Sequence, residues 1–294
     1  MALSAGVAYA EVSVSGNARM GLQYNSGAAA GAAKTTIEKR MTIDLVGTTE
    51  TSSGITFGAK MRLRSEENLG ATGTVVAGAR VYMQTGGFEL AMGNIDGAIE
   101  SMPGLYSANV GLTGLGWGGV LGNTRAKGYW NWDSYNSTGN GAEGIEAIYS
   151  AGAFTGHVSY AEPGLSSGAS AQKRAGVYGA YTMNDWTFAL GYQKSSVATE
   201  DKLILTVGGK IGDYRVGLGF ADNDGVRKIA LNGSATFGAT TVSAYVADEN
   251  SAAATSTAFG LGVSYDLGGA SVVAGIARTD IGTNRADLGV SFSF

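Results

Sequence analysis

Apolar and polar residues alternate with a period of two along most of this chain. Between residues 55 and 64, for example, Phe57 and Met61 fall on one face of an extended strand, and Lys60 and Arg62 fall on the other. Strict alternation of this kind predicts half-buried β-strands. No stretch of comparable length shows the 3.6-residue period of a helix, so we expect an all-β protein with almost no helix.

Sixteen segments carry the alternation, and the connections between them alternate in length. Residues 85–87, 151–153 and 212–213 are examples of the short connections, whereas 25–35 and 95–143 are among the long ones. An antiparallel meander with tight turns at one end and long loops at the other is the layout of a transmembrane β-barrel. The predicted strands span residues 12–24, 36–47, 55–64, 74–84, 88–94, 144–150, 154–161, 174–182, 186–193, 202–211, 214–221, 227–237, 240–247, 257–266, 270–277 and 286–294.

Alternation alone does not separate a membrane barrel from a soluble sheet, because both have one apolar face. Sixteen similar strands, however, exceed what one compact soluble sandwich normally holds. The charge-free face is rich in Ala, Val, Gly and Leu, and so large an apolar patch is unfavourable in water. Aromatic residues also lie where the apolar positions meet the short turns, as in the interfacial girdle of a barrel: Phe88, Phe154, Trp186, Tyr214, Phe237 and Tyr265.

The composition removes several other classes of protein. Glycine supplies 48 of the 294 residues and proline only 2, while hydrophobic residues make up 44%, which argues against a disordered chain. Cysteine is absent and histidine occurs once, which excludes disulfides, thiolate metal sites and a two-histidine metal site within one chain. The net charge of −4 argues against general nucleic-acid binding. The sequence contains no run of 18 apolar residues, so it predicts no transmembrane helix.

Both ends of the chain carry signals of export and membrane insertion. Residues 1–10 read MALSAGVAYA, and Ala8-Tyr9-Ala10 fits the small-x-small pattern of a signal-peptidase site. We interpret residues 1–10 as a residual signal peptide, with an ordinary N-terminal strand or a flexible end as the alternatives. Residues 11–294 form a single barrel domain in this interpretation. The last predicted strand alternates up to the terminal residue, Phe294.

Five segments resemble the general diffusion porins of alphaproteobacteria, the Rhodobacter type. They are Glu11–Tyr24 (EVSVSGNARMGLQY), Val46–Lys60 (VGTTETSSGITFGAK), Met92–Asp96 (MGNID), Ala235–Val246 (ATFGATTVSAYV) and Asp287–Phe294. The resemblance covers residues 11–294 and is interrupted mainly in loops.

The resemblance implies a homotrimer of sixteen-stranded barrels in the bacterial outer membrane, in contact with lipid and lipopolysaccharide. It also implies passive diffusion of small hydrophilic solutes and ions through a water-filled channel. In this family the third long loop folds into the lumen and narrows the pore, and acidic groups on it face basic groups on the opposite wall.

The longest connection, about residues 95–143, is the candidate constriction loop. A connection of this length is usually functional or disordered. A solvated loop would not carry so many apolar side chains, so we expect this one to pack inside the lumen: Met102, Leu105, Tyr106, Val110, Leu112, Leu115, Trp117, Val120, Leu121, Trp130 and Trp132.

Charged residues define a candidate filter on the polar phase of the first strands. Adjacent strands lie ~4.8 Å apart, so side chains on that phase can form one patch that creates a strong local field in a narrow pore. The basic members are Arg19, Arg40, Lys60, Arg62, Arg64 and Arg80, and the acidic candidates are Asp96 and Glu100 on the loop with Glu38 and Asp44 on the wall. The loop is less acidic than is usual in the family, so the ion preference stays open.

Other candidate chemistry is weaker. His157 and Ser159 share the polar phase of one strand, but a barrel enzyme would need a fuller Ser-His-acid site. The inward aromatics Tyr82, Tyr178 and Tyr245 are scattered, which argues against a sugar-specific channel. A substrate-specific channel or a barrel enzyme is therefore the alternative function, and a soluble or adhesive β protein is a third. Acidic loop pairs could hold Ca²⁺: Glu66-Glu67, Asp222 with Asp224, and Asp248-Glu249.

Overall fold

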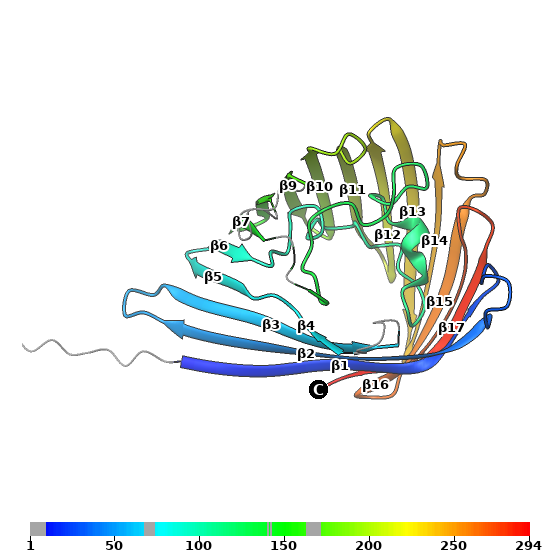
Figure 1. The fold of residues 1–294 in the computed structure, drawn as a ribbon, viewed down its shortest axis with the longest axis horizontal. Helices are drawn as coiled ribbons and strands as arrows, with labels where there is room; N and C mark the ends of the chain where they lie inside the picture. The colour runs from blue at the N-terminus through cyan, green and yellow to red at the C-terminus, as the bar shows by residue number, and fades with distance from the viewer. Residues whose placement is uncertain (1–9, 68–73, 140, 142, 163–171) are drawn as a thin grey trace, which may run out of the picture.

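In the computed structural model, seventeen strand segments form one closed antiparallel sheet around an open interior (Figure 1). The structure describes residues 10–67, 74–139, 141, 143–162 and 172–294. The elements are β1 (Ala10–Asn25), β2 (Thr35–Glu50), β3 (Thr56–Glu66), β4 (Thr74–Val76), β5 (Arg80–Thr85), β6 (Phe88–Gly93), the 3₁₀ turn η2 (Leu115–Gly119), β7 (Gly144–Ala151), β8 (Phe154–Ala161), β9 (Arg174–Met183), β10 (Trp186–Ser195), β11 (Lys202–Ile211), β12 (Tyr214–Asn223), β13 (Val226–Phe237), β14 (Thr240–Glu249), β15 (Ala258–Asp266), β16 (Ala270–Arg278) and β17 (Asn284–Ser293).

The seventeen segments make sixteen barrel strands, as the alternation predicts. Both β4 and β5 pair with β3, so they are two parts of one strand that is interrupted at residues 77–79. At the interruption the Gly78 N–H donates to the Gly139 carbonyl at 2.8 Å, which connects the wall to the long loop. Among the described residues, no helix is long and apolar enough to cross a membrane.

The barrel closes between its first and last strands. β1 pairs antiparallel with both β2 and β17, and Gly16 and Phe294 exchange backbone hydrogen bonds of 2.7 and 2.9 Å. Closure satisfies the backbone groups that an open edge would leave unpaired in lipid. Ala10, the last residue of the expected signal peptide, is the first residue of β1, and residues 1–9 lie outside the described part of the chain.

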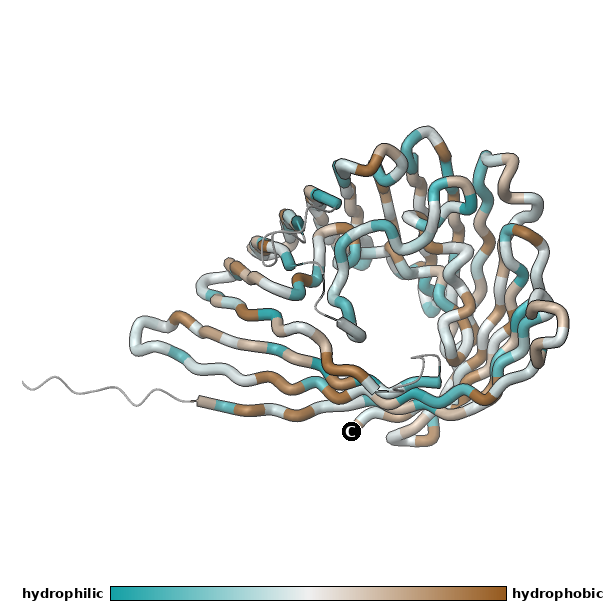
Figure 2. Tube along the Cα trace, viewed as in Figure 1, coloured by the Kyte–Doolittle hydropathy of each residue, from teal (hydrophilic) through white to brown (hydrophobic). Residues whose placement is uncertain are grey.

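Hydrophobic and hydrophilic positions alternate along the strands (Figure 2). The large hydrophobic side chains of the strands are the exposed ones, so the outward face is apolar. Along β10, for instance, Phe188, Leu190 and Tyr192 are exposed while the residues between them are buried. Five aromatic residues of the predicted girdle are exposed as well: Phe88, Phe154, Tyr214, Phe237 and Tyr265. The sixth, Trp186, is half-buried because its ring lies over Gly209, where a β-carbon would approach it to 2.5 Å.

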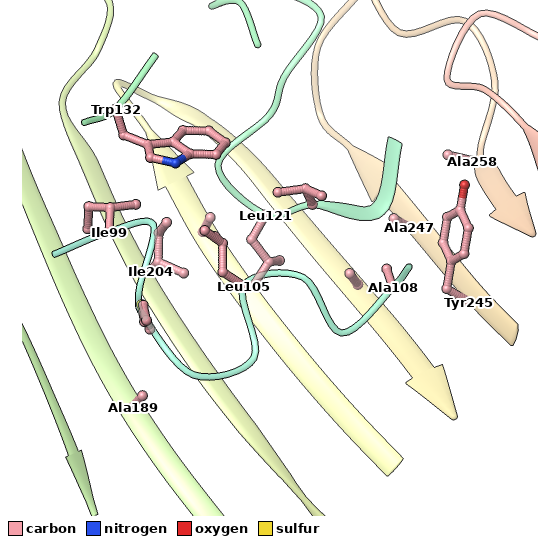
Figure 3. Close-up of a cluster of buried hydrophobic side chains, with 14 of the residues drawn as sticks. Ile99, Leu105, Ala108, Leu121, Trp132, Ala189, Ile204, Tyr245, Ala247 and Ala258 are labelled. Carbon is pink, nitrogen blue, oxygen red and sulfur yellow. The ribbon is translucent and has the colours of Figure 1, made fainter. Parts of the chain in front are cut away.

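The hydrophobic core lies inside the barrel, between the chain that connects β6 to β7 and one half of the wall. Ile99, Leu105, Leu121 and Trp132 of this connection gather over Ile204 of β11 (Figure 3). Small or aromatic wall residues complete the cluster: Tyr178, Ala180, Ala189, Ala221, Ala230, Tyr245, Ala247, Ala258 and Ala277, which lie on β9 to β16. The apolar side chains of the loop therefore pack against β9–β16, whereas its contacts with the side bounded by β1–β5 are mostly polar.

Inward glycines of the wall let the loop approach closely. A β-carbon at Gly219 would lie 2.2 Å from Leu121, and one at Gly275 would lie 2.5 Å from the Gly111 backbone. Such contacts are far below van der Waals distance, so a side chain at either position would displace the loop. Part of the high glycine content therefore serves the packing of the loop inside the lumen.

Candidate pore constriction

The loop begins on a buried carboxylate of β7. The backbone N–H groups of Asp96 and Gly97 donate to the Glu146 carboxylate at 3.1 and 2.8 Å, and the Ala98 N–H donates to Ser159 Oγ at 3.0 Å. Hydrogen bonds from N–H groups to an ionised carboxylate are stronger than those between neutral groups. The first residues of the loop are therefore fixed to the wall formed by β7 and β8.

Arg80 compensates the charge of Glu146, and His157 adds a hydrogen-bond contact. Arg80 Nε donates to Glu146 Oε1 at 2.8 Å, and His157 Nε2 lies 3.0 Å from Oε2. Arg80 also forms ion pairs with Glu89 at 2.6 Å and with Asp96 at 3.2 Å. Burial raises the pKa of Asp96, and Arg80 opposes this shift. Arg80, a predicted member of the basic filter, thus lies buried in an ion cluster beneath the start of the loop.

His157 and Ser159, which the sequence suggests as candidate catalytic residues, both contact the anchor at the start of the loop. His157 faces Glu146, and Ser159 Oγ accepts the Ala98 N–H. Both side chains are buried between the wall and the loop. The two residues therefore support the loop in this structure.

The middle of the loop is held by a second carboxylate, on β17. Asp287 accepts from the Leu112 N–H at 3.0 Å, and from the Thr113 N–H and hydroxyl at 2.7 Å each. Gly111, just before them, has φ +78° and touches the same carboxylate, a conformation and a closeness that favour glycine. Asp287 lies about 175 residues from these partners, so no local pattern in the sequence reveals the contact.

Two lysine side chains hold the loop just past its middle. Lys202 Nζ donates to the Gly122 carbonyl at 3.1 Å, and Lys228 Nζ donates to the Asn123 carbonyl at 2.6 Å. Both lysines are almost fully buried. In addition, Tyr129 donates from its hydroxyl to Asp280 at 2.5 Å, and burial is the main reason that the pKa of Tyr129 is raised.

Two of the predicted basic residues are neutralised by predicted acidic residues on the wall. Arg19 Nε donates to Glu38 Oε1 at 2.6 Å, and Arg62 binds both oxygens of Asp44 at 2.7 and 3.0 Å. The pairs form because β2 places its polar phase between those of β1 and β3. Arg19 Nη1 also donates to the Leu112 carbonyl at 3.2 Å, so this pair contacts the loop.

Three other basic residues give the side bounded by β1–β5 an excess of positive charge. Arg40 lies opposite Arg19 in the β1–β2 register and 4.0 Å from Glu66, the limit of an ion pair. Within the described residues, Arg64 and Lys60 have no carboxylate oxygen within 4.0 Å. Lys60 Nζ instead lies 4.5 Å above the Tyr135 ring of the loop, a cation–π contact across the lumen.

The predicted acidic residue Glu100 orients aromatic rings of the loop. Its Oε2 accepts from Trp132 Nε1 at 2.6 Å and from the Tyr106 hydroxyl. Burial and the neighbouring Glu100 raise the pKa of Tyr106, so the phenol stays protonated and acts as the donor. One carboxylate oxygen thus accepts two hydrogen bonds.

Several cavities lie between the loop and the wall, and two of them are lined by predicted filter residues. A cavity of about 550 Å³ is bounded by Arg64 and Glu66 of β3, by Arg174 of β9 and by the loop from Trp130 to Thr138. A second, of about 230 Å³, is lined by Arg19, Glu38, Trp117 and Arg285, among others. Together they place three of the predicted filter residues, Arg19, Glu38 and Arg64, beside open space in the lumen.

Sequence reasoning missed four charged residues that organise this region. Glu146 and Asp287 hold the loop, Arg174 pairs with Asp133 at 3.3 Å, and Arg285 lies 4.2 Å from the centre of the Trp117 ring. Each lies on the polar phase of a strand, which is the signal that could have identified it. The sequence does not show which of these charges meet the loop.

The acidic pairs considered for Ca²⁺ have partners within the protein. Glu67 pairs with Lys39 at 3.1 Å, Asp224 with Lys127 at 2.7 Å, and the Asp248 carboxylate accepts from Thr257 at 3.1 Å. Glu249 accepts the Arg125 N–H at 2.9 Å. No group of three or more Asp, Glu, His or Cys residues in the described ranges is arranged to hold a metal ion.

A closed antiparallel barrel with an apolar exterior, a charged lumen and an internal loop defines a channel of the bacterial outer membrane. Residues 1–284 match the profile of the Gram-negative porins, and the chain belongs to this family. It is 31% identical to a porin of Fuscovulum blasticum over 294 aligned residues and 34% identical to a porin of Rhodobacter capsulatus over 320; each alignment covers 97% of this chain and all of the relative.

Solved structures agree with this assignment. A triple mutant of the Rhodopseudomonas blastica porin superposes with a TM-score of 0.86 at 30% identity, and a second mutant of that porin with 0.88 at 29%. In both cases the match covers 97% of this chain and all of the solved one. The protein is a general outer-membrane porin, and the resemblance seen in the sequence is confirmed.

Replacing Glu146 by Gln tests the anchor at the start of the loop. The variant keeps the shape of the side chain but leaves Arg80 and His157 facing a neutral amide. Removing one partner from a buried ion pair costs about 3–5 kcal/mol, and the loss here should be smaller because Arg80 keeps its ion pairs with Glu89 and Asp96. We therefore expect a lower midpoint of denaturant unfolding in detergent micelles. Glu162→Gln is the matched control, because that carboxylate pairs with Lys173 at the exposed rim; equal midpoints for both variants would contradict the anchoring role.

The pKa of Asp133 predicts a pH dependence of ion preference. Burial raises this pKa to about 6, although the neighbouring Arg174 opposes the shift. As the pH falls through this value the carboxylate gains a proton, and the lumen gains one positive charge. Under a KCl gradient the reversal potential should shift towards chloride between about pH 7.5 and about pH 5. Asp133→Asn should remove that step, and an unchanged step in the variant would refute the assignment.

Proposed function

We propose that the loop of residues 95–143 and the basic wall form an eyelet that filters small hydrophilic solutes and ions by size and charge. The observation that carries the proposal is the position of the loop against β9–β16. The opposite side of the lumen is bounded by β1–β5, which carry Arg40, Lys60 and Arg64. A solute that crosses the barrel therefore passes between these three cations and the loop.

The arrangement supports both parts of the filter. The size limit follows from the loop, because its contacts with Glu146, Asp287 and Lys202 hold it in place along its length. The charge filter follows from the wall. Since Arg19 and Arg62 are neutralised by Glu38 and Asp44, the net field comes from the three cations with weaker pairing.

We also propose that three copies assemble into a homotrimer surrounded by lipid and lipopolysaccharide. Near the two ends of the chain the outward face carries exposed Val12, Val14 and Leu288, which lipid or a neighbouring subunit can cover. Covering such a face removes apolar surface from water. In planar bilayers a trimer should insert with conductance steps in groups of three.

Neutralising Arg40 and Arg64 tests the charge filter. The double variant Arg40→Gln, Arg64→Gln removes two positive charges from the side of the lumen bounded by β1–β5, so the potassium-to-chloride permeability ratio should rise about two- to fivefold. The measurement is the reversal potential of single channels under a KCl gradient.

The matched control is Arg227→Gln, since Arg227 is an exposed arginine on the outward phase of β13. It should leave the permeability ratio unchanged. If the double variant keeps the reversal potential of the parent protein, the basic wall is not the filter.

A further inference from the structure

An aromatic cluster of the loop faces the lumen. The Trp130 side chain is 49% exposed, although tryptophan is usually well buried. Its ring stacks on Tyr106 with centroids 6.0 Å apart and an angle of 17° between the planes, and it leans on Trp132 at 5.5 Å. The exposed face of Trp130 is thus backed by two further rings.

The surroundings hold this face in position. Glu100 accepts hydrogen bonds from both Tyr106 and Trp132, which fixes the two supporting rings. The Trp130 N–H donates to Asn123 Oδ1 at 2.9 Å. Trp130 also has φ +58°, in the left-handed region that bulky residues avoid. Backbone strain of this kind persists where the surrounding structure imposes it, often at ligand sites.

The exposed ring borders the cavity of about 550 Å³ at the end of the barrel that carries the long connections. That volume lies within the range of about 300–1,000 Å³ typical of small-molecule sites. Arg64 and Tyr135 line the same cavity. An aromatic face and a guanidinium therefore border one space that is open to solvent.

Arg64 is the charged side chain in this cavity that has no ion-pair partner within 4.0 Å in the described ranges. The two acids that line the cavity both lie near arginines. Asp133 lies 3.3 Å from Arg174, which also pairs with Glu200 at 2.9 Å, and Glu66 lies 4.0 Å from Arg40. A carboxylate would supply the acceptor that this guanidinium lacks.

We propose that this cavity binds planar aromatic monoanions, with the ring stacked on Trp130 and the carboxylate on Arg64. Stacking uses the π face that aliphatic acids lack, and the ion pair uses the charge that neutral arenes lack. This proposal rests on the proposed function, because the bound anion can affect transport only if solutes diffuse through the channel. Binding itself does not depend on conduction, which allows the two to be tested separately.

The test uses 4-nitrobenzoate with the full-length folded protein. Nitroarenes quench indole fluorescence on contact, so titration in detergent micelles measures binding without conduction, and single-channel recordings measure reversible block of the current. We expect both effects to saturate at the same concentration. Trp130→Ala and Arg64→Gln should each weaken binding about tenfold.

The controls separate the two contacts. Trp186→Phe removes a tryptophan beside a short turn at the opposite end of the barrel and should leave the affinity unchanged. The neutral 4-nitrobenzyl alcohol and the ring-free cyclohexanecarboxylate should each bind about tenfold more weakly than 4-nitrobenzoate.

Distinct outcomes would overturn this proposal and the one it rests on. Equal affinity for the charged and neutral arenes, block by a neutral hexose without block by 4-nitrobenzoate, or unchanged affinity in Trp130→Ala would each overturn the anion site. Saturable quenching in a folded protein that does not conduct would instead contradict the diffusion channel and leave the binding site in place.

Discussion

The structure depends on the attachment of one internal loop to the barrel wall. Because the outside of a membrane barrel faces lipid, the lumen is the only place where the loop can build a core. Its apolar side chains pack on the alanines and glycines of β9–β16. Polar contacts complete the attachment: Glu146 binds the start of the loop, Asp287 binds the middle, and Lys202 and Lys228 bind the backbone at residues 122–123. The position of the loop then decides which part of the wall borders the pore.

The attachment of the loop also determines which role each charged residue of the lumen has. Arg80 lies beneath the loop and is surrounded by three carboxylates, so its charge serves the anchor. Arg19 and Arg62 are neutralised on the wall itself. Of the six basic residues that the sequence predicts, this leaves Arg40, Arg64 and Lys60 to act on passing ions. A set of basic residues that looks uniform in the sequence therefore divides into anchoring, neutralised and field-producing members.

The sequence predicts the barrel well and the pairing of charges poorly. A period of two is a local property, so the strands follow from it; even the interrupted strand of residues 74–85 is recovered as one segment. The polar phase likewise identifies which side chains face inward. Contacts such as Asp287 with Leu112 join residues 175 positions apart, and they depend on the path of the loop. The aromatic cluster around Trp130 cannot be predicted from the sequence for the same reason, because the fold of the loop determines how its rings pack.

The most direct test of the fixed loop joins it to the wall by a disulfide. The chain has no cysteine, and Thr113 Oγ1 lies 2.7 Å from Asp287 Oδ2, so Thr113→Cys with Asp287→Cys places one new pair at an existing contact. The measurement is the single-channel conductance of this variant when oxidised and when reduced. We predict the conductance of the parent protein when the bond is formed, and larger, fluctuating steps after reduction. A variant that does not cross-link, or that conducts equally in both states, would contradict the account.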